Sequence, residues 1–390
     1  MNIGCLREIK NNENRVGITP DGAKKLTESG HSVFIEHDAG KEAGYEDDAY
    51  IFKGAKILSK EDIYSTSDIL VKVKEPLPEE YPLLELLKGR TLYTYLHLAA
   101  AEKELTSRLL ENSITSIAYE TVIDENNRLP LLAPMSEIAG VLAIQYGAQY
   151  LQKKYNGKGI TLGIITGTPN AKVVVVGGGT AGAKAAMTAA GIGSCVTLFE
   201  LSDRRIEELR DMFRNHRNVK IIKSTPEELK KYTQAADLLI GAVLVPGNKA
   251  PTVVTEDMVR SMQKGSVIID IAIDQGGCIW GSRPTCHDNP IFGIDGKIYC
   301  CVANMPGQVS HQSTKALTSA TITYLKKMAD NGVIELAMKD RNFMHGINTI
   351  AGRLTNKAVA EALSLEYTPT EDVLSEALIV RERTRNTKID

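Results

Sequence analysis

The sequence has few aromatic residues, which make up 5% of the chain and include a single Trp. One Trp is too few for the aromatic platform on which carbohydrate-binding proteins stack sugars. An excess of charge of either sign is also missing, because 46 Lys and Arg face 48 Asp and Glu, for a formal net charge of −2. We therefore expect no nucleic-acid partner and no membrane-surface partner.

Long apolar runs are absent as well. No stretch reaches the roughly 18 residues of a membrane span, and no basic segment followed by an apolar run marks a signal peptide at the N-terminus. The six Cys form no C-x-x-C pair, so we expect no zinc site, and the sequence assigns no metal ligands. They are best interpreted as reduced thiols of a cytoplasmic protein.

What the sequence does contain is typical of a globular protein with two cores. The 390 residues are 43% hydrophobic and 24% charged, and this length favours two domains. The first 130 residues alternate short apolar runs with helical patterns, which predicts βαβ units and a parallel sheet. The predicted strands are Ile3–Cys5, Ser32–Glu36, Ile69–Lys72, Thr91–Leu96 and Ser116–Ala118.

A second series of strands and helices begins at Lys172. Its predicted strands are Val173–Val176, Val196–Glu200, Val219–Ile222, Leu238–Gly241, Val267–Ile271 and Ile298–Val302. Two long helical patterns, Ser136–Tyr155 with Ser136 as its cap and Ser313–Asn331, flank this series. The prediction is an α/β protein with two doubly wound, Rossmann-like domains. Residues 136–306 would form a nucleotide domain inserted into a discontinuous substrate domain of residues 1–135 and 307–390.

A glycine-rich turn, Gly177-Gly178-Gly179-Thr180-Ala181-Gly182, follows the strand Val173–Val176 and precedes an Ala-rich helical pattern. Gly177 permits the tight turn, Gly179 lets the backbone approach a pyrophosphate, and Gly182 lets the helix pack on the strand. Glu200 ends the next strand, where a carboxylate can accept from ribose hydroxyls and repel a 2′-phosphate. This favours NAD over NADP, although the nearby Arg204 and Arg205 weaken that preference.

Three polar groups stand where predicted strands end: Lys72 and Lys74, His97, and Asp274. Ligands of doubly wound sheets bind beyond these carboxyl ends. Each residue also has an ordinary structural interpretation. His97 alone would be a half-buried core His, Lys74 and Arg15 surface cations, and Asp274 a turn or cap acid. Because these residues occur together with a nucleotide-binding motif, a catalytic or substrate-binding role is favoured over the structural interpretations.

Several longer segments closely resemble the bacterial L-alanine dehydrogenase family, in order over nearly the whole chain. They are Lys10–Val16 with Thr19-Pro20, Lys72–Pro76, Tyr95–Ala100, Ala133–Glu137, Asp274–Gly277 and Val302–Pro306. The resemblance implies NAD-dependent interconversion of L-alanine with pyruvate and ammonia, in a homohexamer whose active site lies in a cleft between its domains.

The resemblance also implies residue roles. Arg15 and Lys74 would bind the substrate carboxylate and the pyruvate oxygen, His97 would be the acid/base, and Asp274 would assist water attack and ammonia release. The positions matching NAD contacts are Ser136, Gly177, Gly179, Thr180, Ala181, Gly182, Glu200, Arg205, Ser224, Val243, Leu244, Ile271, Ala272, Ile273, Asp274, Arg283, Val302, Ala303, Asn304 and Met305.

The chain departs from the family pattern at Gly163–Pro169, and at Ser310 and His311, where relatives commonly have proline and arginine. Asn331 stands where some members carry a metal-holding His paired with the acid matching Glu120. Other functions also remain open. The chain could be the NAD-binding subunit of a proton-translocating transhydrogenase, a relative of lysine-forming saccharopine dehydrogenase, or a catalytically idle NAD-binding regulator.

Overall fold

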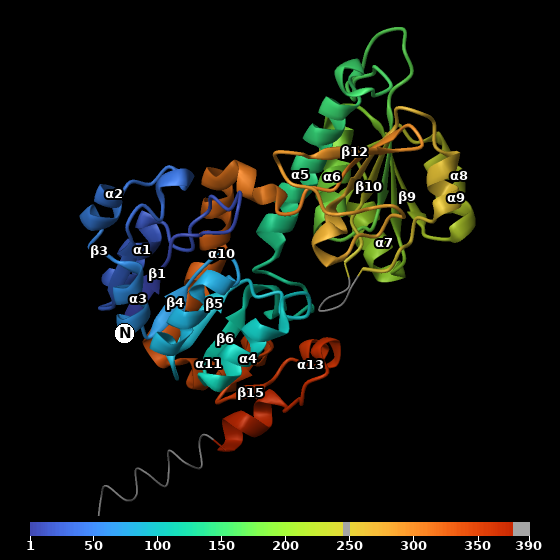
Figure 1. Cartoon of the computed structure of the whole chain (residues 1–390). Helices are drawn as coiled ribbons and strands as arrows, with labels where there is room; N and C mark the ends of the chain where they lie inside the picture. The colour runs from blue at the N-terminus through green and yellow to red at the C-terminus, as the bar shows by residue number, and fades with distance from the viewer. Residues whose placement is uncertain (245–249, 377–390) are drawn as a thin grey trace, which may run out of the picture. The chain divides into compact units, whose positions relative to one another are not determined.

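The computed structural model describes residues 1–244 and 250–376, which form two compact units. Unit 1 comprises Met1–Pro134 and Gly307–Asp390, and unit 2 comprises Met135–Pro306. Residues 377–390, which we assigned from the sequence to the substrate domain, lie outside the described residues. Each unit is built around its own sheet (Figure 1).

The sheet of unit 1 has eight strands in the order β15-β14-β6-β5-β4-β1-β2-β3. Six of them are parallel, and β14 pairs antiparallel with both β6 and β15. The strands are β1 (Asn2–Cys5), β2 (Ser32–Glu36), β3 (Lys56–Leu58), β4 (Ile69–Val71), β5 (Thr91–Thr94), β6 (Thr115–Ala118), β14 (Ile347–Ile350) and β15 (Arg353–Leu354).

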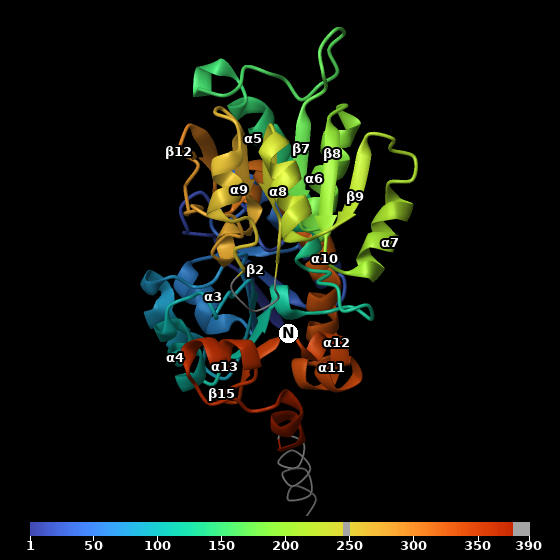
Figure 2. The same cartoon turned by 90° about the vertical axis from the view of Figure 1, so that its right-hand side faces the viewer.

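Helices pack around this sheet. They are α1 (Pro20–Thr27), α2 (Asp47–Phe52), α3 (Lys60–Thr66), α4 (Lys103–Glu111), α10 (Ser310–Asn331), α11 (Val333–Lys339), α12 (Arg341–Met344) and α13 (Lys357–Leu363), with 3-10 turns η1 (Lys41–Ala43), η2 (Pro78–Leu87) and η3 (Tyr119–Thr121). The long α10 contacts α1, and α11 and α12 lie side by side (Figure 2). Residues from both ends of the chain thus share one hydrophobic core, in which Leu70 and Leu92 cluster with Leu354 and Val359.

The sheet of unit 2 has seven strands in the order β12-β13-β11-β10-β7-β8-β9. All neighbours pair in parallel except β12 with β13. The strands are β7 (Lys172–Val176), β8 (Cys195–Glu200), β9 (Val219–Lys223), β10 (Leu238–Gly241), β11 (Val267–Asp270), β12 (Ile291–Ile294) and β13 (Lys297–Cys300). The order reverses at β7, which creates the switch point where doubly wound sheets bind ligands.

Helices cover both faces of this sheet. They are α5 (Ala133–Tyr150), α6 (Thr180–Gly191), α7 (Asp203–Met212), α8 (Pro226–Ala235) and α9 (Glu256–Ser261), with 3-10 turns η4 (Lys153–Tyr155), η5 (Ile271–Gln275) and η6 (Met305–Val309). Figure 1 shows α5 and α6 on one side of the sheet and α8 and α9 on the other. This explains why the four buried residues of β7, at 173–176, are all Val, since a strand buried on both faces needs apolar side chains in successive positions.

The two parallel-dominated sheets confirm the predicted α/β class, with two differences of detail. The tail supplies β14 and β15 to the sheet of unit 1 as antiparallel strands, where the sequence suggested only helices. The helix α5 begins at Ala133 rather than after Ser136, so Ser136 lies inside its first turn and is not its cap. Pro134 is compatible with that start, because the first-turn amides of a helix have no intrahelical partner. None of the described helices is long and apolar enough to cross a membrane.

Candidate active site

The glycine turn of unit 2 connects β7 to α6 and depends on its glycines. Gly177 has φ +104°, and a Cβ there would lie 2.5 Å from the Ala242 carbonyl oxygen. A Cβ at Gly182 would lie 1.8 Å from the Gly177 carbonyl oxygen, so only glycine allows α6 to pack there. A Cβ at Gly179, in contrast, would meet nothing within 4 Å. The turn therefore leaves open backbone at the N-terminus of α6, as a pyrophosphate requires.

Two charged side chains hold this turn, Glu200 at the end of β8 and Arg205 in α7. The Glu200 carboxylate accepts from the Gly178 amide at 2.9 Å and from the amides of Leu201 and Ser202 at 2.7 and 2.9 Å. The Arg205 guanidinium donates to the Gly178 carbonyl at 2.8 Å and pairs with Glu208 at 2.7 Å. Arg205 is thus engaged with the turn itself, which leaves Glu200 as the residue suited to select a ribose.

The other expected cofactor positions of unit 2 collect at the same edge of the sheet. Ser224 follows β9, Val243 and Leu244 follow β10, and residues 271–274 form η5 after β11. Residues 302–305 follow β13, where Asn304 has φ +61°. The carboxyl ends of parallel strands share one edge, so these positions lie along that edge, on both sides of the switch point. Arg283 lies 4.4 Å from the ring centre of Phe292.

The start of α5 runs alongside the start of α6. A Cβ at Gly140 would lie 2.3 Å from the Ala181 carbonyl oxygen, and Glu137 pairs with Lys184 at 2.9 Å. Ser136, one helical turn before Gly140, is half-buried.

In unit 1, Arg15 is a buried cation with a buried partner. Its side chain is 2% exposed, and its Nε donates to Glu13 at 2.6 Å. Burial alone would raise the pKa of Glu13, but the charge and hydrogen bonds of Arg15, together with the charge of Lys74, lower it to about 2. The pair holds the guanidinium in one orientation, which suits recognition of a carboxylate.

The two neighbouring lysines of the β4 end have different surroundings. Lys72 is fully buried, and its ammonium contacts Glu80 at 2.7 Å and Glu8 at 3.6 Å. The Lys74 ammonium makes no ion pair with any residue of the described ranges 1–244 and 250–376. Its backbone is fixed, because its carbonyl accepts from Thr94 at 2.9 Å. Lys72 is therefore structural, whereas Lys74 retains a cation for a ligand.

His97 stands on a strained turn after β5, with φ +47°. Its ring stacks on the buried Tyr95 at 5.7 Å between centroids and 5° between planes. Glu120 accepts from the His97 amide at 2.6 Å, and its carboxylate lies 3.8 Å from Nδ1. The imidazole is thus oriented by a ring on one side and a carboxylate at Nδ1, which leaves Nε2 for proton transfer.

Electrostatic effects link these groups of unit 1. Burial opposes ionisation of Glu75, yet the charges of Lys74, Lys10 and His97 lower its pKa overall. Burial also raises the pKa of Tyr95 well above its usual value, and the charge of Arg15 counteracts that rise. Lys74 and His97 therefore act on the same carboxyl group, Glu75, and Arg15 and Lys74 both act on Glu13.

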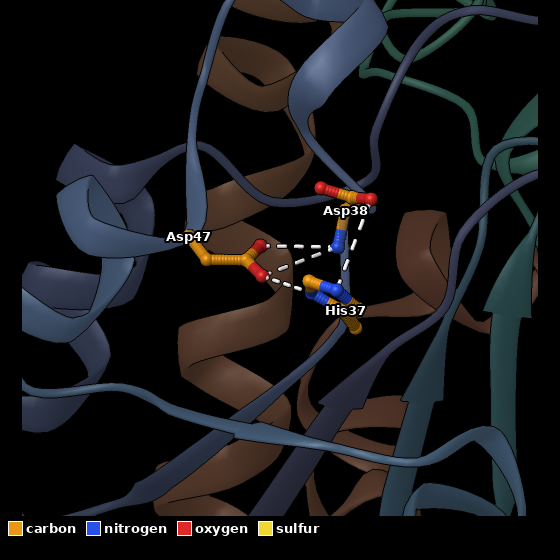
Figure 3. A group of neighbouring side chains, drawn as sticks. All are labelled: His37, Asp38 and Asp47. Atoms are coloured by element: carbon orange, nitrogen blue, oxygen red, sulfur yellow. Dashed lines mark hydrogen bonds and ion pairs between the residues drawn. The ribbon is translucent and has the colours of Figure 1, made fainter.

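One group of the described residues could hold a metal ion: His37, Asp38 and Asp47 at the end of β2 and the start of α2. His37 Nδ1 bonds the Asp47 carboxylate, whereas Nε2 faces Asp38 at 3.9 Å (Figure 3). The bond to Asp47, followed by the charges of Asp38 and Asp47, raises the pKa of His37. Because opposite ring nitrogens face the two carboxylates, the group is better suited to an imidazolium than to a shared ion.

Sequence reasoning missed the partners of the predicted residues. Glu13 stands two residues before Arg15, Glu120 lies 23 residues after His97, and Asp270 ends β11, four residues before Asp274. The Glu-x-Arg spacing and the Asp at the strand end were available as signals. Nothing in the sequence pairs Glu120 with His97, because that contact depends on β6 lying beside β5.

Comparison with known proteins gives matches to two family models. The N-terminal domain model of alanine dehydrogenase/PNT matches residues 4–139, and the C-terminal domain model matches residues 143–357. The alanine dehydrogenase of Methanococcus maripaludis is 47% identical over 96% of this chain and 100% of its own length. Alanine dehydrogenase 2 of Staphylococcus aureus is also 47% identical, with the same coverage.

Solved structures give the same result. An L-alanine dehydrogenase structure superposes with a TM-score of 0.87 and 44% identity, covering 93% of this chain and 99% of that one. A transhydrogenase from Sinorhizobium meliloti, at 23% identity and a TM-score of 0.77, shares the fold. With both family models matched and near-full-length relatives this similar, the chain belongs to the alanine dehydrogenase/PNT family, a family of oxidoreductases.

Proposed function

We propose that this enzyme interconverts L-alanine with pyruvate and ammonia, using NAD as the hydride carrier. The observation that carries the proposal is the grouping in unit 1 of a buried Arg15, a buried Lys74 that forms no ion pair within residues 1–244 and 250–376, and an oriented His97. Two cations can bind the carboxylate and carbonyl oxygens of a small α-amino or α-keto acid, and a proton-transfer group can catalyse its reaction.

The residues of unit 2 fit a dinucleotide. The Gly179 backbone is open, Gly177 and Gly182 leave no room for a side chain, and the Glu200 carboxylate stands at the end of β8. A dinucleotide held by these residues would supply the acceptor for the hydride that leaves the substrate carbon. The acidic Glu200 favours NAD, because a carboxylate repels a 2′-phosphate.

The remaining chemistry falls to the protein. In this proposal, Arg15 and Lys74 hold the substrate carboxylate and stabilise negative charge on the carbonyl oxygen. His97 moves protons to and from the amino nitrogen and the attacking water, while Asp274 assists hydration of the iminium and release of ammonia. These steps transfer protons near neutral pH, which is the range of a His.

The direct test follows NADH absorbance with L-alanine, and in parallel with L-serine, glycine and L-lysine. We expect NAD-dependent turnover with L-alanine at alkaline pH, and reductive amination of pyruvate in the presence of ammonia. Lack of turnover with alanine would refute the proposed function, and preference for lysine would favour a saccharopine dehydrogenase-like activity instead. We further propose that the enzyme is cytoplasmic and forms a homohexamer. Sedimentation at micromolar concentration tests the oligomeric state.

A substitution at Gly179 can test cofactor binding separately from folding. A Cβ there meets nothing within 4 Å, so we expect Gly179→Ala to cost less than about 1 kcal/mol of stability as a helix N-cap change. The methyl group would stand where the pyrophosphate approaches, so NADH affinity should fall about tenfold or more. NADH fluorescence titration measures the affinity, and thermal unfolding measures the stability.

Gly191→Ala provides the matched control at the other end of α6. A Cβ at Gly191 likewise meets nothing within 4 Å, and this position is remote from the turn. NADH affinity should be unchanged in this variant. Equal affinity in the two variants would show that the pyrophosphate does not lie against Gly179.

A further inference from the structure

Asp270, at the end of β11, contacts both ends of the loop that carries Asp274. The side chain is completely buried. Its Oδ1 accepts from the Ala272 amide at 3.1 Å and faces Cys278 Sγ at 3.5 Å. Its Oδ2 accepts from the amides of Cys278 and Ile279 at 2.8 and 3.0 Å and from the Ser282 hydroxyl at 2.7 Å. One carboxylate therefore closes the segment between residues 272 and 278.

The backbone is packed tightly around this carboxylate. A Cβ at Gly277 would lie 2.9 Å from Oδ2, and a Cβ at Gly241 on the neighbouring β10 would lie 3.0 Å from Oδ1. Gly276 and Gly277 have φ +95° and +82°, values that ordinary side chains rarely adopt. Burial raises the pKa of Asp270, and the bonds from Ser282, Ile279 and Cys278 oppose that rise.

Asp274 itself has no comparable support. It is exposed, and its carboxylate makes no hydrogen bond or ion pair with another residue of the described part of the chain. Its place is therefore determined by the loop backbone alone. The 3-10 turn η5 has only five residues, so its own hydrogen bonds cannot hold a side chain to the precision that catalysis needs.

We propose that Asp270 is a positioning residue. It fixes the loop of residues 271–279 and thereby places the Asp274 carboxylate for its role in hydration and ammonia release. This inference rests on the proposed function, in which Asp274 assists hydration and ammonia release. Asp270 touches neither substrate nor reacting atoms in this role. A residue that served folding alone would have the same contacts, so the test must separate stability from the placement of Asp274.

The first variant is Asp270→Asn, which keeps the shape of the side chain. Its amide nitrogen must face at least one of the former donors, so one end of the loop is released. We expect faster hydrogen–deuterium exchange in residues 272–279 without substrate, and a fall in kcat of about 30-fold or more. Ser282→Ala is the matched control. It removes one donor and keeps the charge, so kcat should stay within about threefold of the wild-type value.

A double-mutant cycle with Asp274→Asn provides the decisive readout. If Asp270 acts through Asp274, adding Asp270→Asn to the Asp274→Asn enzyme should change kcat by less than about threefold. The same loss in both backgrounds would overturn the proposal and leave Asp270 as a structural residue. Unchanged exchange in the Asp270→Asn loop would overturn it as well.

The exchange experiment also separates this inference from the proposed function. It needs no turnover, so it measures loop order even if alanine proves not to be the substrate. Absence of alanine oxidation in the wild-type enzyme, with a loosened loop in Asp270→Asn, would refute the proposed substrate and retain the ordering role of Asp270. Normal oxidation with an unaltered loop would refute the positioning role alone.

Discussion

Replacing His97 with Asn should lower kcat for alanine oxidation by about 10²–10⁴-fold, the usual contribution of a general acid or base. Asn is preferred to Ala here because it tolerates the left-handed backbone that His97 adopts at φ +47°. It fills similar space above Tyr95 but cannot exchange a proton near neutral pH. Steady-state kinetics in both directions measure the loss.

NADH affinity distinguishes a chemical role from a structural one. His97 belongs to unit 1, whereas the glycine turn belongs to unit 2, so His97→Asn should leave NADH binding nearly intact. The control is His345→Ala, an exposed His of unit 1, which should change neither kcat nor affinity. A parallel loss of NADH binding and turnover in His97→Asn would contradict the assigned role.

The second large effect is expected from the two lysines at the end of β4, which should respond in opposite ways. Lys72→Met leaves Glu8 and Glu80 buried without their cation, and such a loss costs about 3–5 kcal/mol of stability. Burial already raises the pKa of Glu8 to about 7 even though the charge of Lys72 counteracts it. We expect a lowered denaturation midpoint or failure to fold.

Lys74→Met, the matched variant, should fold normally. Its backbone contacts to Glu8 and Thr94 do not involve the side chain. The loss should appear in kcat/KM for alanine and pyruvate, by about 100-fold, because a charge-assisted contact to the substrate disappears. Urea unfolding and steady-state kinetics on both variants provide the comparison. If Lys74→Met is the less stable of the two, the roles of the two lysines must be exchanged.

Much of the architecture could be predicted from the chain because it depends on local patterns. Strands β2 (Ser32–Glu36) and β10 (Leu238–Gly241) have the bounds that the sequence predicted. In contrast, β12 and β14 were missed. β12 lies at the edge of its sheet, so only one neighbour supports it, and β14 forms by pairing with β6, more than 200 residues earlier in the chain. The β-propensity of a segment does not reveal a pairing partner that is so distant in the chain.

The candidate site divides in the same way. The sequence alone determined the glycine turn, Glu200 and the polar residues at strand ends, since spacing along the chain decides which residues follow a strand. Tertiary structure alone decided that Lys72 pairs with Glu8 and Glu80, whereas Lys74, although also buried, forms no ion pair with a described residue. It also decided that Glu120 lies under His97 and that Asp270 closes the Asp274 loop. The physical reason is that the role of a charged side chain depends on the groups around it. Folding brings those groups together from distant parts of the chain.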